Sequence, residues 1–373
     1  MKKVCIITTV HSVFDIRIYH KEAKSLVRVG YEVILIARHK INETVGGVKI
    51  LALPFSRNRL LRFLYLDYKA TNLAFKQKAD IYHFHDPEFL PWACLLKKNT
   101  RAKIIYDVHE DVPKQILSKK WIPRFLRKPI SYFFNLFEKK CASKFDAIIS
   151  VVPVVAEKFK NKYSICVANY PKLDYFEQIG GLVDEKNKKS VFTAIYVGGM
   201  TEIRGIRQII EANRLISARK KIKLVMAGPF SDNGFENEIK ANPEWKKIDY
   251  LGVLPIKDVY KEITAADVGL VCLQPEPNYV IAQPIKMFEY MAAGIPVIAS
   301  NFSKYREIIE NNKCGLCVDP REPAKIADAI IHIMEHPDEA RKMGENGRKA
   351  VRELYNWEKE EEKLLETYKR LLS

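Results

Sequence analysis

Short apolar runs rich in β-branched residues alternate with amphipathic segments along the whole chain. The runs have the length of buried strands, and the segments between them have the spacing of helices. Strands that alternate with helices predict a parallel, doubly wound sheet. The expected strands are 4–9, 32–37, 48–53, 81–85, 104–108 and 147–152 in the first half, and 191–197, 222–227, 248–251, 268–273, 297–299 and 315–318 in the second.

A polar, aperiodic stretch at residues 171–190 separates the two series and is expected to be a linker. The pattern therefore predicts an α/β protein with two Rossmann-like domains. The N-terminal domain would span residues 1–170 and the C-terminal domain residues 171–355. A charged amphipathic helix in residues 356–373 would end the chain.

The positive charge of the chain is confined to its first half. The 373 residues carry a net charge of +17. Through Tyr170 there are 31 Lys and Arg against 14 Asp and Glu, whereas the rest of the chain has 31 of each. A one-sided basic field concentrates anionic partners such as nucleic acid, anionic lipid headgroups or phosphorylated substrates. Nucleic acid is not expected, because no recognised binding motif is present.

Basic side chains are mixed with aromatic ones in residues 57–69 and 114–140. This mixture suits a helix that lies on an anionic membrane surface. The alternative is that the aromatic rings are buried in the core and the lysines are solvated. The second stretch holds Lys119, Lys120, Arg124, Arg127, Lys128, Lys139 and Lys140 together with Trp121, Phe125, Tyr132, Phe133, Phe134 and Phe137.

Cysteine usage and hydropathy bear on the location of the protein. Seven scattered cysteines, an odd number without framework spacing, indicate a reducing cytosol. No run approaches the ~20 apolar residues of a membrane-spanning helix. The expected location is the cytoplasm, peripheral at the inner face of the membrane.

Residues 268–299 predict a strand, a loop, a helix, a glycine and a second strand. Pro284 can begin the helix, because a first-turn proline loses no hydrogen bond, and Gly294 suits its C-terminus. The loop lies at the carboxyl end of a strand and leads to backbone N–H groups without helical acceptors, which favour an anion such as a diphosphate. Glu289, five residues into the helix, could reach a ribose hydroxyl.

This stretch resembles the donor-site signature of retaining family 4 glycosyltransferases (glycosyl transferases group 1) of the GT-B fold. One position departs from it, because Ile281 stands eight residues before Glu289, where the family often has a second glutamate. The resemblance implies two Rossmann-like domains facing a cleft, with the acceptor on the first, the nucleotide-sugar on the second, and the C-terminal helix crossing back to the first. The matching residues are Pro284, Lys286, Glu289, Tyr290, Met291, Gly294 and Pro296.

The loop after the first strand of the second domain contains Gly198, Gly199 and Arg204. Glycines at such a turn let backbone N–H groups approach a phosphate, and an arginine adds a bidentate charge. A plain turn with a solvated arginine is the alternative. By resemblance, Arg204 and Lys286 would neutralise the leaving diphosphate. The donor-binding residues implied are Gly198, Gly199, Glu202, Val253, Leu254, Tyr279, Gln283, Ile285 and Glu289.

Polar residues also follow the strands of the first domain. The resemblance places His109 near the transferred sugar, as a third catalytic candidate beside Arg204 and Lys286; an ordinary strand-end histidine is the alternative. His83 and His85 share one face of a strand, with no obvious third ligand. The GT-B fold generally works without a metal ion, so neither a metal site nor a cofactor is expected. Asp86 would line the acceptor side or cap a helix.

His11, Asp15 and Arg17 follow the first strand, where many family members have a glycine pair. These three residues could bind the acceptor, or an Asp15–Arg17 contact could order the loop. The sequence does not distinguish the two roles.

The resulting prediction is an enzyme of the hexosyltransferase type (EC 2.4). It would move a sugar from a nucleotide-diphosphate-sugar, with UDP favoured, to a lipid-linked or polysaccharide acceptor in cell-surface glycan biosynthesis, such as that of lipopolysaccharide. Three alternatives remain open: a sugar-nucleotide epimerase of the same fold, a non-catalytic basic binding protein, and a silent sugar-nucleotide sensor.

Overall fold

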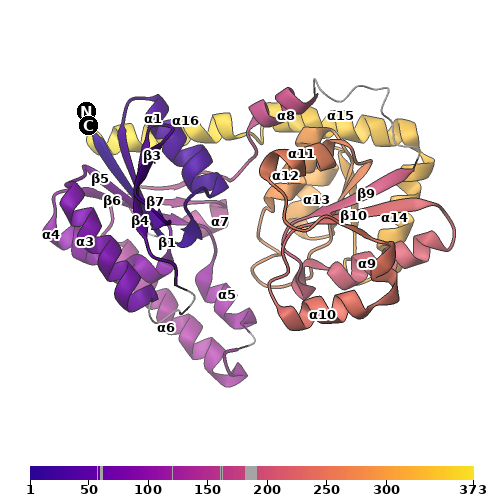
Figure 1. Ribbon diagram of the computed structural model, residues 1–373, viewed down its shortest axis with the longest axis horizontal. Coiled ribbons are helices and arrows are strands. Elements are labelled where there is room, and N and C mark those ends of the chain that lie inside the picture. The colour runs from indigo at the N-terminus through magenta and orange to yellow at the C-terminus, as the bar shows by residue number, and fades with distance from the viewer. Residues whose placement is uncertain (57, 59–61, 120, 160, 162, 181–190) are drawn as a thin grey trace. The chain divides into compact units, whose positions relative to one another are not determined.

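The computed structural model describes residues 1–373 except 57, 59–61, 120, 160, 162 and 181–190 (Figure 1). The chain divides into two compact units, one formed by Met1–Asn169 with Lys359–Ser373 and the other by Tyr170–Glu358. The described residues do not include all of the predicted basic stretches or of the predicted linker. Arg57, Arg59 and Lys120 of the basic stretches and residues 181–190 of the linker lie outside them.

The described residues of the first unit form an eight-stranded sheet in the order β3-β4-β2-β1-β5-β6-β7-β8. Only its edge strand β3 runs antiparallel, paired with β4. The order reverses between β1 and β5, which both pair with their neighbours in parallel. The strands are β1 Lys3–Ser12, β2 Glu32–Arg38, β3 Glu43–Val45, β4 Val48–Leu53, β5 Ile81–Phe84, β6 Lys103–Val108, β7 Ala147–Ser150 and β8 Ser164–Cys166.

The two faces of this sheet differ in polarity. Tyr82, Phe84 and Tyr106 lie in a hydrophobic core with α3, α4 and α6. The alternate residues of β5 face the other side, where His83 contacts Tyr368 of α16. The helices of the unit are η1 Ile16–Ala23, α1 Lys24–Arg28, η2 Arg62–Leu66, α3 Asp67–Gln77, η3 Pro87–Phe89, α4 Leu90–Asn99, α5 Val112–Ser118, α6 Arg124–Ala142 and α7 Pro153–Ala156, with α16 Trp357–Leu372 at the C-terminus.

The described residues of the second unit form a parallel six-stranded sheet in the order β11-β10-β9-β12-β13-β14. Along β9, Ala194 and Tyr196 belong to one hydrophobic core and Ile195 to another, so both faces of the sheet are covered. The order reverses between β9 and β12. The strands are β9 Phe192–Val197, β10 Ile222–Ala227, β11 Asp249–Tyr250, β12 Val268–Val271, β13 Val297–Ser300 and β14 Gly315–Val318.

Helices of the second unit are divided between the two cores. One core contains residues of α11, α12, α13 and α15, and the other contains residues of α9, α10 and α14. The helices are α8 Leu173–Gly180, η5 Glu202–Arg204, α9 Ile206–Ser217, α10 Asn233–Ala241, η6 Pro243–Lys247, α11 Ile256–Thr264, α12 Ile285–Ala293, α13 Ser303–Asn311, α14 Pro323–Glu335 and α15 Pro337–Glu353.

Each predicted strand is present, and the differences are local. The expected linker begins with helix α8, because Phe176 of this segment packs into the core beside Tyr260. The short strands β3 and β8 were not predicted, since three-residue edge strands carry little periodicity. No helix formed by the described residues has the length and apolarity needed to cross a membrane.

Candidate functional site

The reversal of strand order between β9 and β12 identifies the binding edge of the second sheet. In open parallel sheets, ligands bind beyond the carboxyl ends of the strands where the order reverses. The loop after β9 contains Gly198 and Gly199, and the segment after β12 leads into α12. The predicted donor residues of both segments therefore belong to this edge of one unit.

Glycine is required in the β9 loop because its backbone packs against neighbouring backbone. Gly198 has φ 132°, and a Cβ on Gly228 would lie 2.0 Å from the carbonyl oxygen of Gly198. Gly205 has φ 76°, and a Cβ there would lie 2.0 Å from the carbonyl oxygen of Cys272. L-residues rarely adopt these dihedrals. The loop is thus held between the ends of β10 and β12 in one conformation.

Helix α12 begins after Pro284 and ends at Gly294, as predicted, with Gly294 in the left-handed region at φ 78°. Tyr290 joins this helix to β9, because its hydroxyl accepts a hydrogen bond from the Val197 backbone N–H at 2.9 Å. A Cβ on Gly269 would lie 2.2 Å from the Tyr290 ring, so β12 makes room for that ring. Tyr290 and Gly294 of the signature are therefore structural.

Lys286 and Arg204 converge on Gly198. A Cβ on Gly198 would lie 3.0 Å from Lys286 Nζ and 3.1 Å from Arg204 Nη1. The Lys286 ammonium lies 3.9 Å from the centroid of the Tyr196 ring. It is buried and has no hydrogen-bond acceptor in the part of the chain that the structure describes. Burial lowers the pKa of Lys286 well below its ordinary value, the charge of Arg204 lowers it further, and Glu289 opposes both effects.

This arrangement favours an anion beside Gly198. The two cationic groups converge on one glycine, and the first-turn N–H groups of α12 lack helical acceptors. An anion would supply the hydrogen-bond acceptor that Lys286 lacks, and a buried charge without a partner is costly. A phosphate or diphosphate is the anion that such glycine-rich loops and helix termini bind.

The other predicted donor residues occupy varied positions. Glu289 is buried and accepts a hydrogen bond from Tyr260 Oη at 3.3 Å. Gln283 Oε1 accepts a hydrogen bond from Tyr170 Oη at 3.1 Å. Glu289 and Gln283 therefore also make hydrogen bonds that stabilise the second unit. Tyr279, Ile285, Gly199 and Leu254 are half-buried, and Glu202 and Val253 are exposed. Their contacts with a donor stay predictions.

In the first unit, the strand order reverses between β1 and β5, and His11, Asp15, Asp86 and His109 lie near this reversal. His11 Nδ1 is 3.7 Å from Asp15 Oδ2, and His11 Nε2 is 3.7 Å from Asp86 Oδ1. The rings of His11 and His109 have centroids 5.2 Å apart. Burial lowers the pKa of His109 to about 4. The cluster is polar, and the acceptor role of His11 and Asp15 stays a prediction.

Asp86 does not cap a helix, which corrects one of the two roles expected for it. Although Asp86 precedes η3, its carboxylate makes no capping hydrogen bond there. Its Oδ2 accepts hydrogen bonds from Thr8 Oγ1 at 3.0 Å, from the Thr9 backbone N–H at 2.6 Å and from the Val10 backbone N–H at 3.2 Å. Asp86 therefore holds the end of β1, which short-range sequence patterns do not reveal.

The Arg17 side chain lies apart from the polar cluster that His11 forms with Asp15, Asp86 and His109. Asp15 Oδ1 accepts from the Arg17 backbone N–H at 2.9 Å, so Asp15 does order the loop, but the Arg17 side chain turns inward and is only 2% exposed. Its Nη2 donates to Asp107 Oδ2 at 2.8 Å and its Nη1 to the Val167 carbonyl oxygen at 2.9 Å. These contacts favour the ordering role over acceptor binding for Arg17.

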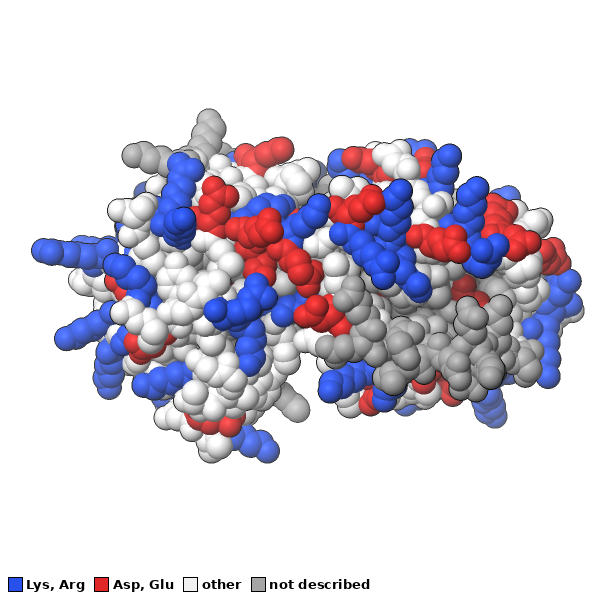
Figure 2. Space-filling model, turned by 90° about the horizontal axis from the view of Figure 1, so that it is seen from above, with Lys and Arg blue, Asp and Glu red and all other residues white. Residues whose placement is uncertain are grey.

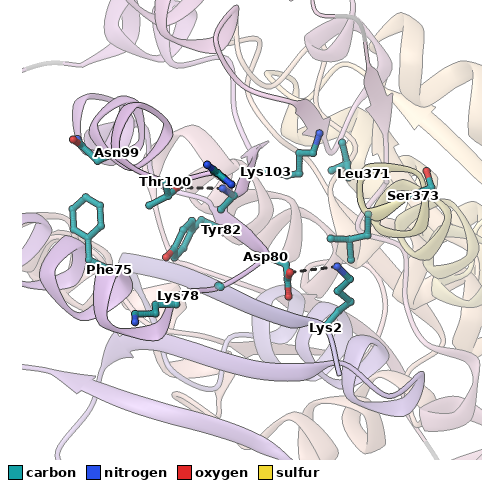
Figure 3. Close-up of a pocket in the computed structure, with 14 residues that line it drawn as sticks. Lys2, Phe75, Lys78, Asp80, Tyr82, Asn99, Thr100, Lys103, Leu371 and Ser373 are labelled. Carbon is teal, nitrogen blue, oxygen red and sulfur yellow. Dashed lines mark hydrogen bonds and ion pairs between the residues drawn. The ribbon is translucent and has the colours of Figure 1, made fainter.

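A cavity of about 610 Å³ lies at the opposite end of the first sheet (Figure 3). Its lining includes Lys2, Asp80 and Lys103, which lie at the starts of β1, β5 and β6. Lys2 Nζ is 3.5 Å from Asp80 Oδ1 (Figure 3). Because ligands of such sheets bind at the carboxyl ends of the strands, this cavity is not the candidate site.

Comparisons with known proteins agree with this geometry. A model of the glycosyl transferases group 1 matches residues 183–350, and a model of glycosyltransferase family 4 matches residues 17–168. The chain belongs to the family 4 glycosyltransferases of the GT-B fold. The predicted family and fold class are thereby confirmed.

Relatives of the chain in sequence include other glycosyltransferases. A glycosyltransferase of Methanocaldococcus jannaschii, described as uncharacterised, is 23% identical over 368 residues, 93% of this chain and 92% of that protein. The GDP-mannose-dependent alpha-(1-6)-phosphatidylinositol monomannoside mannosyltransferase of Mycobacterium tuberculosis is 39% identical over 74 residues, 20% of this chain and 19% of that protein.

Two solved structures are similar along their whole length. Sucrose-phosphate synthase from Thermosynechococcus elongatus superposes with a TM-score of 0.77 at 19% identity, covering 100% of this chain and 99% of that one. Anabaena HepE in complex with UDP-glucose has a TM-score of 0.72 at 14% identity, covering 99% of this chain and 100% of that one. At these identities the likeness shows the shared fold.

The His11 contacts predict a pH dependence of the glycosyltransferase's stability. Burial lowers the pKa of His11, but its interaction with the Asp15 carboxylate, which accepts from the imidazole, and the charge of Asp86 outweigh burial, so the pKa lies above its ordinary value of 6.5. A raised pKa adds stability that is fully present below about pH 6.5 and is lost as the pH rises through the folded-state pKa. Melting temperatures between about pH 6 and 8.5 should fall more steeply for the wild type than for His11→Gln. Parallel curves would contradict the pairing.

Sequence reasoning did not predict that Glu22 and Asp107 lie beside His83 of β5 and His85, which directly follows β5. In the structure, one ligand-type atom from each of Glu22, His83, His85 and Asp107 lies within 4.8 Å of the others. Asp107 could have been linked to His85, since both end adjacent strands on the same face. Glu22 could not, because only the fold brings η1 over that face.

Proposed function

We propose that this glycosyltransferase moves a hexose from a nucleoside-diphosphate-sugar to a lipid-linked or polysaccharide acceptor, with retention at the anomeric carbon. The observation that supports it most is the convergence of Lys286 Nζ and Arg204 Nη1 on Gly198, at 3.0 and 3.1 Å from a Cβ placed there. Two fixed cations beside a glycine turn and a helix N-terminus match the charge of a diphosphate.

Electrostatic stabilisation of the leaving group would be the main catalytic contribution. The bond between the anomeric carbon and the diphosphate oxygen breaks, and negative charge develops on the phosphate. Arg204 and Lys286 would meet that charge without reorganisation, because burial and packing already hold both side chains. They supply the positive charge for which other phosphate sites use a metal ion, so we propose that transfer needs none.

Retention is proposed to occur on one face of the sugar. Ile281 occupies the position where many family members have a glutamate, so no carboxylate is offered there as a nucleophile. The acceptor oxygen would bond to the anomeric carbon on the face from which the diphosphate leaves, and the acceptor proton would pass to a phosphate oxygen of the leaving group. The role of His109 near the transferred sugar stays a prediction from the family resemblance.

UDP is the favoured nucleotide of the proposal, with GDP as the named competitor. HepE was solved with UDP-glucose, whereas the mycobacterial mannosyltransferase is named for GDP-mannose. A radiolabelled panel of UDP-, GDP- and ADP-sugars, incubated with lipid-linked and polysaccharide acceptors, tests the proposal directly. Label that moves to an acceptor from one donor supports it, and release of only an epimerised nucleotide-sugar contradicts it.

Arg204→Lys tests whether the guanidinium geometry matters. A lysine keeps the charge but loses the planar, bidentate fork. We expect kcat/KM for transfer to fall by about tenfold, equivalent to about 1.4 kcal/mol of transition-state stabilisation. Arg207→Lys is a matched control, because Arg207 pairs with Glu238 on the surface. Equal activity of the Arg204 variant and the control would contradict the assignment.

Helix α6 supports the proposed anionic membrane surface. Of its described residues, only Glu138, Cys141 and Ala142 are buried. Phe125 and Phe133 are 79% and 67% exposed, so these rings are not core residues. Helix α6 lies beside α5 (Figure 1). Its exposed basic residues are Arg124, Lys128, Lys139 and Lys140.

Basic side chains are also present on another face of the N-terminal unit (Figure 2). On the face seen in Figure 2, blue side chains fringe the left end, which belongs to the N-terminal unit, while blue and red are mixed on the other unit. A red group nearer the middle interrupts the blue. Basic residues beside exposed aromatic rings combine electrostatic attraction with apolar insertion.

Phe125→Ser with Phe133→Ser is expected to weaken binding to vesicles of phosphatidylcholine and phosphatidylglycerol by more than tenfold, because each buried ring contributes about 1.5–3 kcal/mol. Cosedimentation measures the effect. Val253→Ser is the control, since Val253 is 71% exposed on the second unit. Unchanged binding of the double variant would remove the membrane from the proposal and leave the donor site untouched.

A further inference from the structure

A cluster of four buried metal-ligand side chains lies on the polar face of the first sheet. Glu22 comes from η1, His83 and His85 come from β5 and its carboxyl end, and Asp107 comes from β6. Each of the four residues is at most 2% exposed. One nitrogen or oxygen atom from each lies within 4.8 Å of the other three. The proposed transfer does not use this cluster.

Each side chain of the cluster has a buried polar atom that lacks a hydrogen bond to any described residue. Among the described residues, His83 Nε2, His85 Nε2, Asp107 Oδ1 and Glu22 Oε2 have no hydrogen-bond partner, and Glu22 Oε1 makes only its ion pair with Arg17 Nε. Buried polar atoms normally have a hydrogen-bond partner. When several buried polar atoms without a partner lie close together, they indicate a missing ligand. The four atoms without a partner belong to four different side chains of metal-binding type.

Both histidines present the same ring nitrogen to the cluster. The Nδ1 atom of His83 is 2.6 Å from Tyr368 Oη, and that of His85 is 3.1 Å from His109 Nε2. Metal-binding histidines usually engage their second ring nitrogen in this way, which fixes the ring and leaves the first free for the ion. The Nε2 atoms are then the ligands.

The distances suit a small tetrahedral ion. His85 Nε2 lies 3.4 Å from Glu22 Oε2, and His83 Nε2 lies 3.7 Å from Asp107 Oδ2. Ligands at about 2.0–2.1 Å from a tetrahedral zinc ion are about 3.4 Å apart. Two imidazoles and two carboxylates form a donor set that zinc accepts.

Charge balance leaves room for a cation. Arg17 Nε is 2.8 Å from Glu22 Oε1, and Arg17 Nη2 is 2.8 Å from Asp107 Oδ2. One guanidinium between two ionised carboxylates leaves a net charge of −1, which is costly at full burial. Arg17 donates to Asp107 Oδ2, the oxygen beside His83 Nε2, while Asp107 Oδ1 has no hydrogen bond to a described residue.

We propose that Glu22, His83, His85 and Asp107 bind one zinc-type divalent cation that ties η1 to the ends of β5 and β6. The ion is structural, because four protein ligands close a tetrahedral shell. The competing arrangement is a proton held between the two carboxylates, which would satisfy the same atoms without a metal ion.

Metal content of protein made without a histidine tag tests the proposal. After expression with added zinc and dialysis against EDTA, unfolding in guanidinium should release about one zinc ion per chain, as measured by mass spectrometry of the elements. Glu22→Gln and His85→Gln should release almost none, because each removes one ligand. Wild-type protein without metal would overturn the proposal in favour of the shared proton.

A second metal-type group provides the control. His332, His336 and Glu339 also bring ligand atoms within 4.8 Å, but they are not buried. His332→Gln with His336→Gln should keep the full zinc content, and loss of zinc in this variant would overturn the assignment to the buried cluster.

Cobalt-substituted wild type gives a readout that requires no variant to fold: strong visible bands of tetrahedral cobalt are expected, and weak octahedral bands would contradict the site.

Discussion

Lys286→Met is expected to lower kcat/KM for sugar transfer by about 10²–10³-fold, the usual cost of removing one charge-stabilising donor at an oxyanion. The same variant should melt no lower than the wild type. Its Nζ is buried without a hydrogen-bond acceptor among the described residues, and methionine fills a similar volume without a charge. Loss of activity together with an unchanged or higher melting temperature would show that Lys286 binds the diphosphate and does not stabilise the fold.

A surface lysine gives the matched comparison for Lys286. Lys304 pairs with Glu307 on α13 and is exposed, so Lys304→Met should change neither activity nor melting temperature measurably. If Lys286→Met kept wild-type activity, the role of Lys286 at the diphosphate would be wrong. If it lost activity only because the fold collapsed, Lys286 would be a structural residue.

Arg17→Met is expected to destabilise the protein by about 3–5 kcal/mol, because it leaves the buried carboxylates of Glu22 and Asp107 without their guanidinium. It also removes the hydrogen bond to the Val167 carbonyl oxygen. For a unit of this size, such a loss lowers the melting temperature by about 10 °C. Calorimetry should show the shift in the transition of the first unit.

The matched control for Arg17 is an exposed arginine. Arg214 pairs with Glu211 on the surface of α9, so Arg214→Met should cost at most about 1 kcal/mol. Similar melting temperatures for the two variants would show that the Arg17 contacts carry little stability. A raised KM for acceptor in a stable Arg17→Met protein would instead favour the acceptor role that its burial argues against.

The local structure around the predicted donor residues was predictable because it is encoded locally. Pro284, Lys286 and Gly294 stand within one loop and one helix, so their order in the sequence already places them on a structure. Arg204 was predictable for the same reason, from the glycines before it. What the fold adds is their convergence on Gly198, which depends on the pairing of β9 with β12.

The polar groups of the first unit were less predictable because their partners are distant in the sequence. Arg17 and Asp107 are 90 residues apart, and Asp86 and Thr8 are 78 apart. From its neighbours in the sequence alone, each of these side chains would be predicted only to line a polar site. The sheet order β1-β5-β6 decides which of them meet, and no short pattern states that order.

Exposure of the aromatic residues on α6 was also open from sequence alone. The helix alternates basic and aromatic residues, a pattern that fits either burial against a core or a free surface. The structure decides in favour of exposure for Phe125 and Phe133, because the buried residues of α6 lie near its C-terminal end, at Glu138, Cys141 and Ala142.

Thermal stability with nucleoside diphosphates tests the central claim most directly, because a ligand that binds the folded state raises the melting temperature by mass action. UDP, GDP, ADP and CDP should be compared on the wild type and on Lys286→Met. One diphosphate, UDP by the present proposal, should raise the melting temperature of the wild type, and the shift should be lost in the variant. The absence of a shift with every diphosphate, or an equal shift in the variant, would contradict a donor site built on Lys286 and Arg204.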